Sequence, residues 1–462
     1  MSQNWASVLY LVTIICFVLA LRFLSSPTTA RRGNRIGAVG MAIAVAVTLA
    51  LEEVHLNWRI VVGAIVGGVF GLVAARRVKM TAIPQMVALF NGVGGGAAAL
   101  VSLAEFHNRA PDPGRLHGDV SVAIVASALI GSVSFAGSMV AFAKLQELIQ
   151  GRPITYPGQQ VGNLVLLGAV VVAGIALVAG AESEWLFVLV IVGSLLFGVL
   201  FVLPIGGADM PVVISLLNAF TGLAAAATGF ELESNVLIVS GALVGASGTL
   251  LTMLMGTAMN RSIGNVLFGA FGQVSAGGGA AAVTDGTVRS ATAEDVAIML
   301  AYAARVVVVP GYGMAVAQAQ HAVRELAEEL EKRGVNVDYA IHPVAGRMPG
   351  HMNVLLAEAN VPYPALKEMD EVNPEFPQTD VALVIGANDV VNPAARNDTS
   401  SPIYGMPILD VDHAKQIVVM KRSMSPGFAG IDNPLFLDPK TVMLFGDAKE
   451  SVVKLVGDVK GL

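Results

Sequence analysis

The chain has 462 residues, of which 55% are hydrophobic and only 13% are charged, and its mean hydropathy is +0.69. This composition lies outside the range of soluble globular proteins and predicts a large membrane-embedded part. The formal net charge of -6 argues against binding of nucleic acid, and the single cysteine, Cys16, excludes both a disulfide framework and a cysteine-based metal site.

Apolar segments dominate the first 260 residues. Nine of them are each close to the ~20 residues that a bilayer core requires. We predict membrane spans at residues 5–24, 36–51, 58–75, 83–104, 119–142, 161–181, 185–203, 211–229 and 235–258. The first segment lacks the basic n-region of a signal peptide, is long enough to span, and is followed by more spans, so we expect a span and not a cleaved signal peptide. The small residues at 277–282 predict a flexible linker over 261–290, between a transmembrane domain at 1–260 and a further domain at 291–462.

Positive charge is distributed unevenly between the predicted loops. One side of the membrane has ten Lys and Arg residues, namely Arg22, Arg31, Arg32, Arg35, Arg76, Arg77, Lys79, Lys144, Arg152 and Arg261. The other side has Arg59, Arg109 and Arg115, and two of its loops carry only acids (Glu182 and Glu184; Glu231 and Glu233). By the positive-inside rule the N-terminus lies outside and the C-terminal part is cytoplasmic, as an odd number of spans requires.

Few polar side chains occur inside the predicted spans. Asn91 and Asn218 each form either a structural hydrogen bond or part of an ion path, and the residues alone leave both interpretations open. Asp209 lies in the short loop 204–211, where simple solvation is the alternative to a role in such a path. No predicted span has a charged residue or a histidine near its centre.

Two series of glycines predict close contact between helices. They are Gly63, Gly67 and Gly71 in the third span, and Gly241 and Gly245 in the ninth. Small residues four positions apart share one helix face and let two backbones approach each other.

From residue 291 the pattern changes to alternating helices and strands. Thr292 and Asp295 predict the start of a helix that leads into the apolar strand 306–310. Further strands are expected at about 335–342, 381–386, 416–421 and 442–446, with helices from Gly313 to Gly334, around 350–360 and over 447–459. Near-continuous apolar strands are typical of a parallel sheet that is covered on both faces. We therefore predict a multi-span α-helical membrane domain followed by a cytoplasmic Rossmann-like α/β domain with a doubly wound parallel sheet.

Polar sequence rich in glycine follows four of the predicted strands. In a doubly wound sheet the ligand lies beyond the carboxyl ends of the strands, so these segments form the candidate nucleotide site. The first of them follows a β-branched run and opens a helix, whose N-terminus would offer free backbone N–H groups to a pyrophosphate. The candidate residues are Gly311, Tyr312, Gly313, Met314 and Ala315; Val344, Ala345, Gly346, Arg347, Met348 and Pro349; Gly386, Ala387, Asn388, Asp389 and Asn392; and Lys421, Arg422, Ser423, Gly427, Phe428, Ala429 and Gly430.

Charge at the strand ends indicates which nucleotide is bound. NAD-selective sites usually place an acid after the second strand, but Asp338 lies inside that strand. Lys421, Arg422 and Ser423 offer two positive charges and a hydroxyl, which suit the 2′-phosphate of NADP; a solvated surface pair is the alternative. The sequence shows no nucleophile elbow and no acid–base pair beside these segments, which is compatible with direct hydride transfer between two nicotinamides.

These segments, together with residues 204–211 and 258–262, closely resemble the β subunit of proton-translocating NAD(P) transhydrogenases, and the resemblance covers essentially the whole chain. It implies a membrane domain fused to an NADP(H)-binding domain in a bacterial inner membrane. It also implies an α subunit that binds NAD(H) and adds further membrane helices, with the αβ units forming a homodimer in the lipid bilayer. The implied reaction is hydride transfer from NADH to NADP⁺, driven by inward proton flow.

The resemblance also assigns roles to individual residues. Residues 311–315 would approach the pyrophosphate and ribose, Arg347, Met348 and Pro349 would line the phosphate side, and Asn388, Asp389 and Asn392 would lie by the nicotinamide, with Asp389 implicated in coupling. Lys421, Arg422 and Ser423 would hold the 2′-phosphate under a lid at 427–430, and Gly446, Asp447 and Ala448 would lie near the adenosine. Asn91, Asp209, Asn218 and Arg261 match positions associated with the proton path.

Two positions depart from the family's pattern. Many members have a histidine where this chain has Asn91, and an asparagine cannot carry a proton near neutral pH. We therefore expect the protonatable relay group on helices of the α subunit. Phe428 stands where a tyrosine is common, so the ring is kept and the hydroxyl is lost.

Two other functions fit the same composition. A transporter or channel gated by a regulatory NADP(H)-binding domain explains the fused domains equally well, and it would show no hydride transfer. A soluble-type dehydrogenase with a membrane anchor would not need nine spans.

Overall fold

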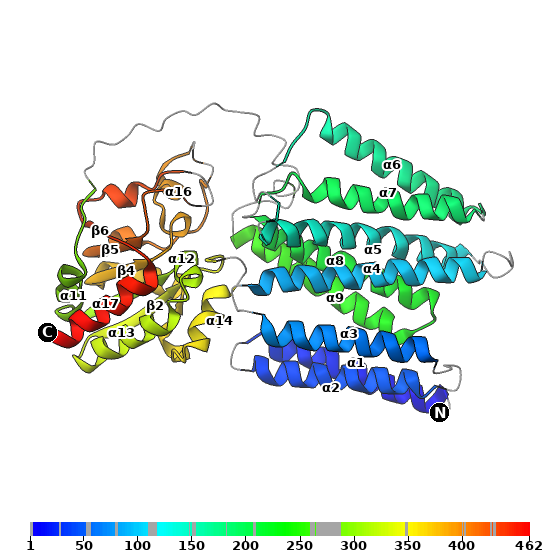
Figure 1. Ribbon diagram of the computed structural model, residues 1–462, viewed down its shortest axis with the longest axis horizontal. Helices are drawn as coiled ribbons and strands as arrows, with labels where there is room; N and C mark the ends of the chain where they lie inside the picture. The colour runs from blue at the N-terminus through cyan, green and yellow to red at the C-terminus, as the bar shows by residue number, and fades with distance from the viewer. Residues whose placement is uncertain are drawn as a thin grey trace. The chain divides into compact units, whose positions relative to one another are not determined.

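The structure is a computed structural model of the chain. It describes residues 3–26, 29–51, 57–78, 82–109, 118–146, 148–149, 154–181, 183–206, 209–258, 264, 288–346, 350–399, 401, 403–425, 427 and 431–462. The chain divides into two compact units, Met1–Thr252 and Met253–Leu462. The described part of the first unit is helical, and the second contains a parallel sheet with helices (Figure 1).

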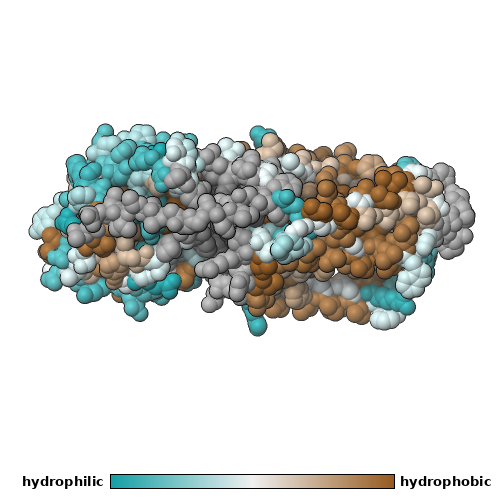
Figure 2. Space-filling view, turned by 90° about the horizontal axis from the view of Figure 1, so that it is seen from above, coloured by the Kyte–Doolittle hydropathy of each residue, from teal (hydrophilic) through white to brown (hydrophobic). Residues whose placement is uncertain are grey.

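The helices of the first unit match the nine predicted spans. They are α1 (Gln3–Leu24), α2 (Ala30–Leu49), α3 (Trp58–Arg77), α4 (Ile83–Arg109), α5 (Gly118–Leu145), α6 (Gln159–Val178), α7 (Glu184–Val202), α8 (Met210–Glu231) and α9 (Asn235–Ala258). Among the described residues, eight of them are long and apolar enough to cross a membrane, and α2 is the exception. Hydrophobic side chains cover most of the visible surface of this unit, whereas polar side chains are more frequent on the other (Figure 2).

Several helices extend beyond the predicted spans because charged residues at their ends stay helical. Arg31, Arg32 and Arg35 were assigned to a loop, but they lie in the first two turns of α2. Similarly, Arg109 belongs to α4 and forms an ion pair of 2.6 Å with Glu105, one turn earlier. Hydropathy marks only the apolar middle of a span, so the predicted spans are shorter than the helices.

Glycines bring some helices of this unit into backbone contact. A Cβ built on Gly222 of α8 would lie 2.4 Å from the backbone nitrogen of Gly245, and one built on Gly241 would lie 2.4 Å from that of Ala226. The predicted contact face of α9 is therefore confirmed, and its partner is α8. The prediction for α3 is wrong within this chain, since no described atom lies within 4 Å of a Cβ built on its glycines Gly63, Gly67 or Gly71.

The second unit is built on one six-stranded parallel sheet. Its strands are β1 (Arg305–Pro310), β2 (Asn336–Ile341), β3 (Leu366–Glu368), β4 (Val381–Ile385), β5 (Gln416–Lys421) and β6 (Thr441–Phe445), in the order β3-β2-β1-β4-β5-β6. Helices α11 (Ala293–Ala301), α12 (Tyr312–Val316), α13 (Gln320–Lys332), α14 (His351–Glu358), α15 (Met369–Val372), α16 (Ala394–Asn397) and α17 (Ala448–Gly461) connect and flank them. Short 3-10 helices include η6 (Asn373–Gln378), η7 (Asp389–Val391), η8 (Val411–His413) and η9 (Pro434–Leu437). The predicted α/β class is confirmed.

The helix expected between Gly313 and Gly334 is in fact two helices. Gln318 has a φ of +54°, a left-handed conformation that ends α12 and lets α13 start in a new direction. Val316, expected on the buried face, is 46% exposed, whereas Val323, Leu326 and Leu330 of α13 are buried. Residues 293–301 form the helix that was expected there, and a capping box between Thr292 and Asp295 starts it.

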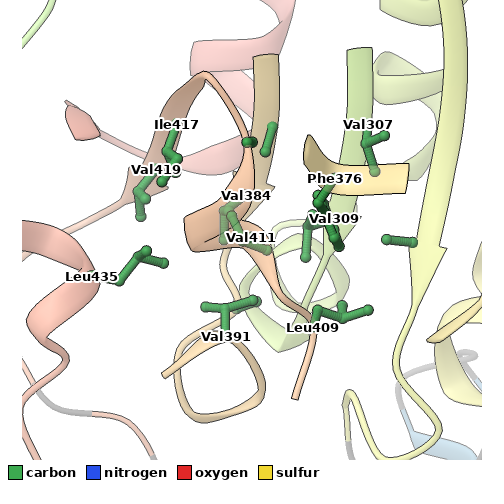
Figure 3. Packing of buried hydrophobic residues seen from close by; sticks show 14 of the residues in the cluster. Val307, Val309, Phe376, Val384, Val391, Leu409, Val411, Ile417, Val419 and Leu435 are labelled. Carbon is green, nitrogen blue, oxygen red and sulfur yellow. The ribbon is translucent and has the colours of Figure 1, made fainter. Parts of the chain in front are cut away.

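Alternating residues of the strands divide the core into two layers. On one face, Val307, Val309, Val384, Ile417 and Val419 pack against side chains from the short helical turns, such as Phe376, Val411 and Leu435 (Figure 3). On the other face lie α13 and α17, with α11 packed against α17. Burial of each such side chain stabilises the fold by roughly 1.5–3 kcal/mol. The strand order reverses between β1 and β4, and a crevice for ligands is expected beyond the carboxyl ends of these two strands.

Candidate functional site

The loops after β1 and β4 meet at the point where the strand order reverses. A Cβ on Gly311 would lie 2.4 Å from the backbone of Ala387, and one on Gly313 would lie 2.7 Å from the Cα of Gly386. Gly386 itself has a φ of +66°, and its own Cβ would lie 2.3 Å from the Cα of Gly313. Three positions therefore have to be glycine for the two loops to fit together, and this contact forms the floor of the candidate site.

This contact uses some of the backbone donors that were expected to remain free. The N–H of Gly311 donates to Ile385 O and that of Gly313 to Gly386 O, each over 2.9 Å. Two N–H groups beside the start of α12 are thus already occupied by protein carbonyls, and the predicted supply of free donors was too large. Met314 and Ala315 are fully buried and support the loop from beneath, while Tyr312 is partly exposed.

The loop after β2 is held by a buried histidine. His342 is 2% exposed; its Nδ1 accepts the N–H of Val344 over 3.2 Å, so its Nε2 donates to Pro407 O over 2.8 Å. Burial holds the pKa of His342 below its usual value, which keeps the ring neutral. Ala345 and Gly346 continue the loop, and Gly346 has a φ of +103°. Arg347, Met348 and Pro349 lie outside the described residues.

The loop after β4 is fixed by amide side chains. Asn433 Nδ2 donates to the backbone oxygen of Asn388 over 3.0 Å and also faces its Oδ1 at 3.3 Å. Asn392 is fully buried; its Nδ2 donates to Asp432 O over 3.1 Å and its Oδ1 accepts the N–H of Ala394 over 3.0 Å. Since both ends of its amide make hydrogen bonds inside the protein, Asn392 helps to fix the conformation of this loop.

Asn388 and Asp389 are covered by the segment that follows β5. A Cβ on Gly427 would lie 2.6 Å from both Asn388 Nδ2 and Asp389 Oδ1. Gly427 therefore lies directly against the two side chains. Asn388 Nδ2 is buried and makes no hydrogen bond with the described residues. Phe428, Ala429 and Gly430, the rest of the expected lid, lie outside the described residues.

Positive charge lies at the carboxyl end of β5. Arg422 and Ser423 are exposed, and the hydroxyl of Ser423 pairs with that of Ser425 at 3.0 Å. Lys421 is partly buried, with its Nζ 4.8 Å from the ring centre of Phe436. Burial lowers the pKa of Lys421, and the charges of Asp389 and Asp432 oppose that shift. The structure thus brings this cation into the electrostatic range of Asp389, and the two residues come from neighbouring strand ends.

The end of β6 completes this edge of the sheet. The N–H of Gly446 donates to Lys421 O over 3.1 Å, and Gly446 has a φ of +153°. Asp447 is the N-cap residue of α17, and its Oδ1 accepts the N–H of Lys449 over 2.9 Å. Ala448 is buried at the start of the same helix. The carboxylate of Asp447 is therefore engaged in capping, which the sequence did not indicate.

In the first unit, Asn91 lies at the interface of α4, α5 and α8. Its Nδ2 donates to Ser138 Oγ over 2.9 Å and lies 3.4 Å from Ser134 Oγ, while its Oδ1 is buried and makes no hydrogen bond with the described residues. Ser134 Oγ in turn donates to Leu217 O over 2.8 Å and lies 2.6 Å from the hydroxyl of Thr221. The buried amide of Asn91 is thus connected through serine and threonine hydroxyls to both α5 and α8.

Asn218 and Asp209 both belong to the α8 segment. Asn218 is partly buried and lies one turn before Thr221 on the same side of the helix, although no hydrogen bond joins it to Asn91 among the described residues. Asp209 is the N-cap residue of α8, nine residues and therefore about 13 Å before Asn218 along the helix. Arg261 lies outside the described residues.

Two ionisable residues at helix ends are buried, which the sequence analysis did not predict. Lys144 was counted as a loop cation, but it is 2% exposed and its Nζ donates to Leu203 O and, over 2.7 Å, to Ile205 O. Glu231 was counted as a loop acid, but it has no exposed surface. The serines of α5, at positions 127, 134 and 138, share one helix face, and this spacing was the available signal for a polar interface.

Comparison with known proteins gives one consistent result. The family described as NAD(P) transhydrogenase beta subunit matches residues 6–458. Two relatives from Rhodospirillum rubrum, both named NAD(P) transhydrogenase subunit beta, are each 50% identical to this chain over 463 residues. The match covers 99% of this chain and 99% of each relative.

Proposed function

Because the chain belongs to the family of NAD(P) transhydrogenase β subunits, we propose that it binds NADP(H) beyond the carboxyl ends of β1, β4 and β5. A β subunit implies an α subunit, which in this proposal holds NAD(H) and contributes further membrane helices. A homodimer of such αβ units in a bacterial inner membrane, with the N-terminus outside and the sheet unit in the cytoplasm, completes the assembly.

The observation that carries the proposal is the backbone contact between Gly313 and Gly386 at the point where the strand order reverses. A dinucleotide lies across this point in doubly wound sheets, with its pyrophosphate close to the glycine turn after the first strand. Here only glycines fit, so the ligand can approach the backbone closely. Val344 to Gly346 follow β2 and Gly446 to Ala448 follow β6, at the same end of the sheet, where they would border the phosphates and the adenosine. Arg347, Met348 and Pro349, which lie outside the described residues, would line the phosphate side.

The choice of NADP rests on the residues after β5. Arg422 and Ser423 are exposed and therefore accessible to the 2′-phosphate, and Lys421 adds a second positive charge. A guanidinium and an ammonium group together with a hydroxyl can neutralise a phosphate dianion and donate several hydrogen bonds to it. The Gly427 segment, which rests on Asn388 and Asp389, would then retain the nucleotide.

The chemistry of this proposal is hydride transfer. The reacting C–H bond of NADH on the α subunit breaks and a C–H bond forms on NADP⁺ held by this chain, giving NAD⁺ and NADPH without net proton uptake. The nicotinamides supply this chemistry, and the protein's part is to bring the two rings together and exclude water. Asn388 and Asp389 lie at the end of β4, where they can orient the nicotinamide. The carboxyl group of Asp389 would also interact differently with the charged nicotinamide of NADP⁺ and the neutral one of NADPH.

Proton translocation is assigned to the first unit. The polar interface around Asn91, together with Asn218 and Asp209 on α8, gives a membrane-embedded chain of groups that can bind water. In this proposal residues 1–260, which include these groups, form the proton-translocating domain, and residues 261–290, beginning with Arg261, link it to the NADP(H)-binding domain at 291–462. Binding of NADP⁺ or NADPH biases the position of the soluble domain, and that bias opens or closes the path.

The test uses inverted membrane vesicles that contain both subunits. We expect NADH-dependent reduction of NADP⁺ that is accelerated when a proton gradient is imposed and loses this acceleration when an uncoupler is added. A transporter or channel that is merely gated by NADP(H) would show no hydride transfer in either condition. Vesicles with the chain but without the α subunit are the control, and they should bind NADPH without turnover.

A further inference from the structure

A carboxyl group lies fully buried at the end of α8. Glu231 has no exposed surface, and the hydroxyl of Ser102 on α4 faces both of its carboxyl oxygens, at 3.0 and 3.2 Å. Ionisable residues buried in membrane helices are expensive and usually functional.

The groups around Glu231 connect it to the surface. Glu105 and Arg109, one and two turns beyond Ser102 on α4, are partly buried and form an ion pair of 2.6 Å. Arg109 Nη2 donates to the backbone oxygen of Glu231 over 2.8 Å, which fixes the end of α8 against α4. Within the described part of the chain, Ser102 is the side chain that hydrogen-bonds to the Glu231 carboxyl, so this carboxyl is shielded and still lies next to a partly buried charge pair.

Further charged residues at this end of the helices are more remote. His107 of α4 forms an exposed ion pair with Glu184 of α7 at 2.7 Å. Glu233, two residues after Glu231, is exposed. On α5, Asp119 in the first turn is exposed, and the uncharged Ser127 contacts Thr228. Glu231 is therefore the fully buried carboxyl among the described acidic residues at this end of α4, α5 and α8.

Hydroxyl groups lead from Glu231 towards Asn91. Thr228, one turn earlier on α8, shares a hydrogen bond of 2.8 Å with Ser127 of α5. Two turns before Thr228 on α8, Thr221 contacts Ser134 at 2.6 Å. Ser134 and Ser138 both face Asn91.

The three helices present these polar groups at matching intervals. Asn91 and Ser102 are eleven residues apart on α4, as are Ser138 and Ser127 on α5, which runs in the opposite direction. This spacing keeps each pair on one helix face and separates its members by about 16 Å. The α4–α5–α8 interface therefore has one polar layer at Asn91, Ser134 and Thr221 and a second at Ser127, Thr228 and Glu231. Between the two layers, Gly95 and Gly131 pack backbone to backbone.

We propose that Glu231 is the proton-binding group of this chain on the path through the α4–α5–α8 interface. This inference rests on the proposed proton translocation and adds a protonatable residue to it, where Asn91 cannot carry a proton. The Glu231 carboxylate takes a proton from water at the Glu105–Arg109 end, which the charge distribution of the loops assigns to the outside. It then releases that proton to water and the hydroxyls of Thr228, Ser127, Thr221 and Ser134, which can both donate and accept.

The test compares E231Q with E231D and with E233Q in vesicles that contain both subunits. Glutamine keeps the size of the side chain and its capacity to accept from Ser102, but it cannot exchange a proton. We expect E231Q to slow the proton uptake that the reverse reaction, reduction of NAD⁺ by NADPH, drives into inverted vesicles, by about 100-fold, the scale of a lost acid–base group. NADPH binding should stay at the parental affinity, E231D should recover part of the rate, and E233Q should behave as the parent because that side chain is exposed.

The outcomes separate this inference from the function on which it rests. If the parent itself shows no proton uptake, the proposed function fails. If the parent takes up protons and E231Q does so at the parental rate, the role of Glu231 is refuted and the proposed function stands. Should E231Q fail to accumulate in the membrane, S102A decides, because it keeps the carboxyl and removes its hydrogen-bond donor. A shift in the pH profile of proton uptake in S102A supports the proposal, and an unchanged profile overturns it.

Discussion

Gly313 and Gly386 meet backbone to backbone: the N–H of Gly313 donates to Gly386 O over 2.9 Å, and a Cβ on Gly386 would lie 2.3 Å from the Cα of Gly313. The two residues are far apart in sequence, and they meet because β1 and β4 are neighbours in the sheet. The fold of the second unit and the shape of the candidate site thus depend on the same contact.

Substitution of Gly386 by alanine should disrupt both. Its φ of +66° is unfavourable for alanine, which costs about 1–3 kcal/mol, and the added Cβ also displaces Gly313. We expect a lower melting temperature of the detergent-solubilised protein and loss of NADPH binding. Gly334→Ala is the matched control, because Gly334 has a φ of +86° but no described atom near its Cβ position. Equal effects of the two substitutions would show that the contact with Gly313 is unimportant.

Substitution of Lys421 should act on one nucleotide selectively. Loss of a charge-assisted hydrogen bond to the 2′-phosphate costs about 1.5–3 kcal/mol, so Lys421→Ala should weaken NADPH binding about tenfold or more. Binding of NADH to this chain should hardly change, because NADH lacks that phosphate. Lys415→Ala is the control, since Lys415 forms an ion pair with Asp380 at the opposite end of β5. Unchanged affinity of Lys421→Ala for NADPH would refute the assignment.

The sheet could be predicted from sequence because its strands are short runs of apolar residues. The expected limits of β2, β4, β5 and β6 agree with the structure to within one residue. The exception is β3 at the edge of the sheet, where Leu366 and Lys367 are partly buried and Glu368 is exposed, so this strand has no apolar signature. The break at Gln318 also could not be foreseen, because a left-handed glutamine has no marker in the sequence.

The sequence could group the loops of the candidate site, but it could not predict the contacts that their side chains make. The carboxyl ends of parallel strands always share one edge, so the loops after β1, β2, β4 and β5 could be grouped without knowledge of the strand order. The side-chain contacts, however, could not be predicted: Asn392 donates to the backbone oxygen of Asp432, which is 40 residues away, and accepts the N–H of Ala394. Likewise, the burial of Glu231 depends on Ser102, which is 129 residues distant in sequence.

The stability of the protein should depend on the protonation of His342. In the unfolded chain this imidazole takes up a proton as the pH falls through about 6.5, whereas burial lowers its pKa in the folded protein, which therefore stays neutral to lower pH. Stability should consequently fall below pH ~6.5, by at most about 1.4 kcal/mol per pH unit from this residue.

The pH dependence can be assigned by substitution. The melting temperature of His342→Gln should be lower than that of the parent at neutral pH, and its decline between pH 6.5 and more acidic values should be shallower. His413→Gln, which changes an exposed histidine in the same domain, should retain the parental decline. If His342→Gln declines as steeply as the parent, other groups account for the acid sensitivity.

Removal of the Ser134 hydroxyl should impair the membrane path and leave the nucleotide site intact. Ser134 is fully buried and links Asn91, Thr221 and Leu217 O. Ser134→Ala leaves those groups without their shared partner, which costs about 1–3 kcal/mol and loosens the α4–α5–α8 contact. We expect slower proton uptake in vesicles at unchanged NADPH affinity. Ser247→Ala, which removes a hydroxyl bonded within its own helix to Val244 O, should leave both properties at the parental level, and equal proton uptake in the two variants would remove Ser134 from the path.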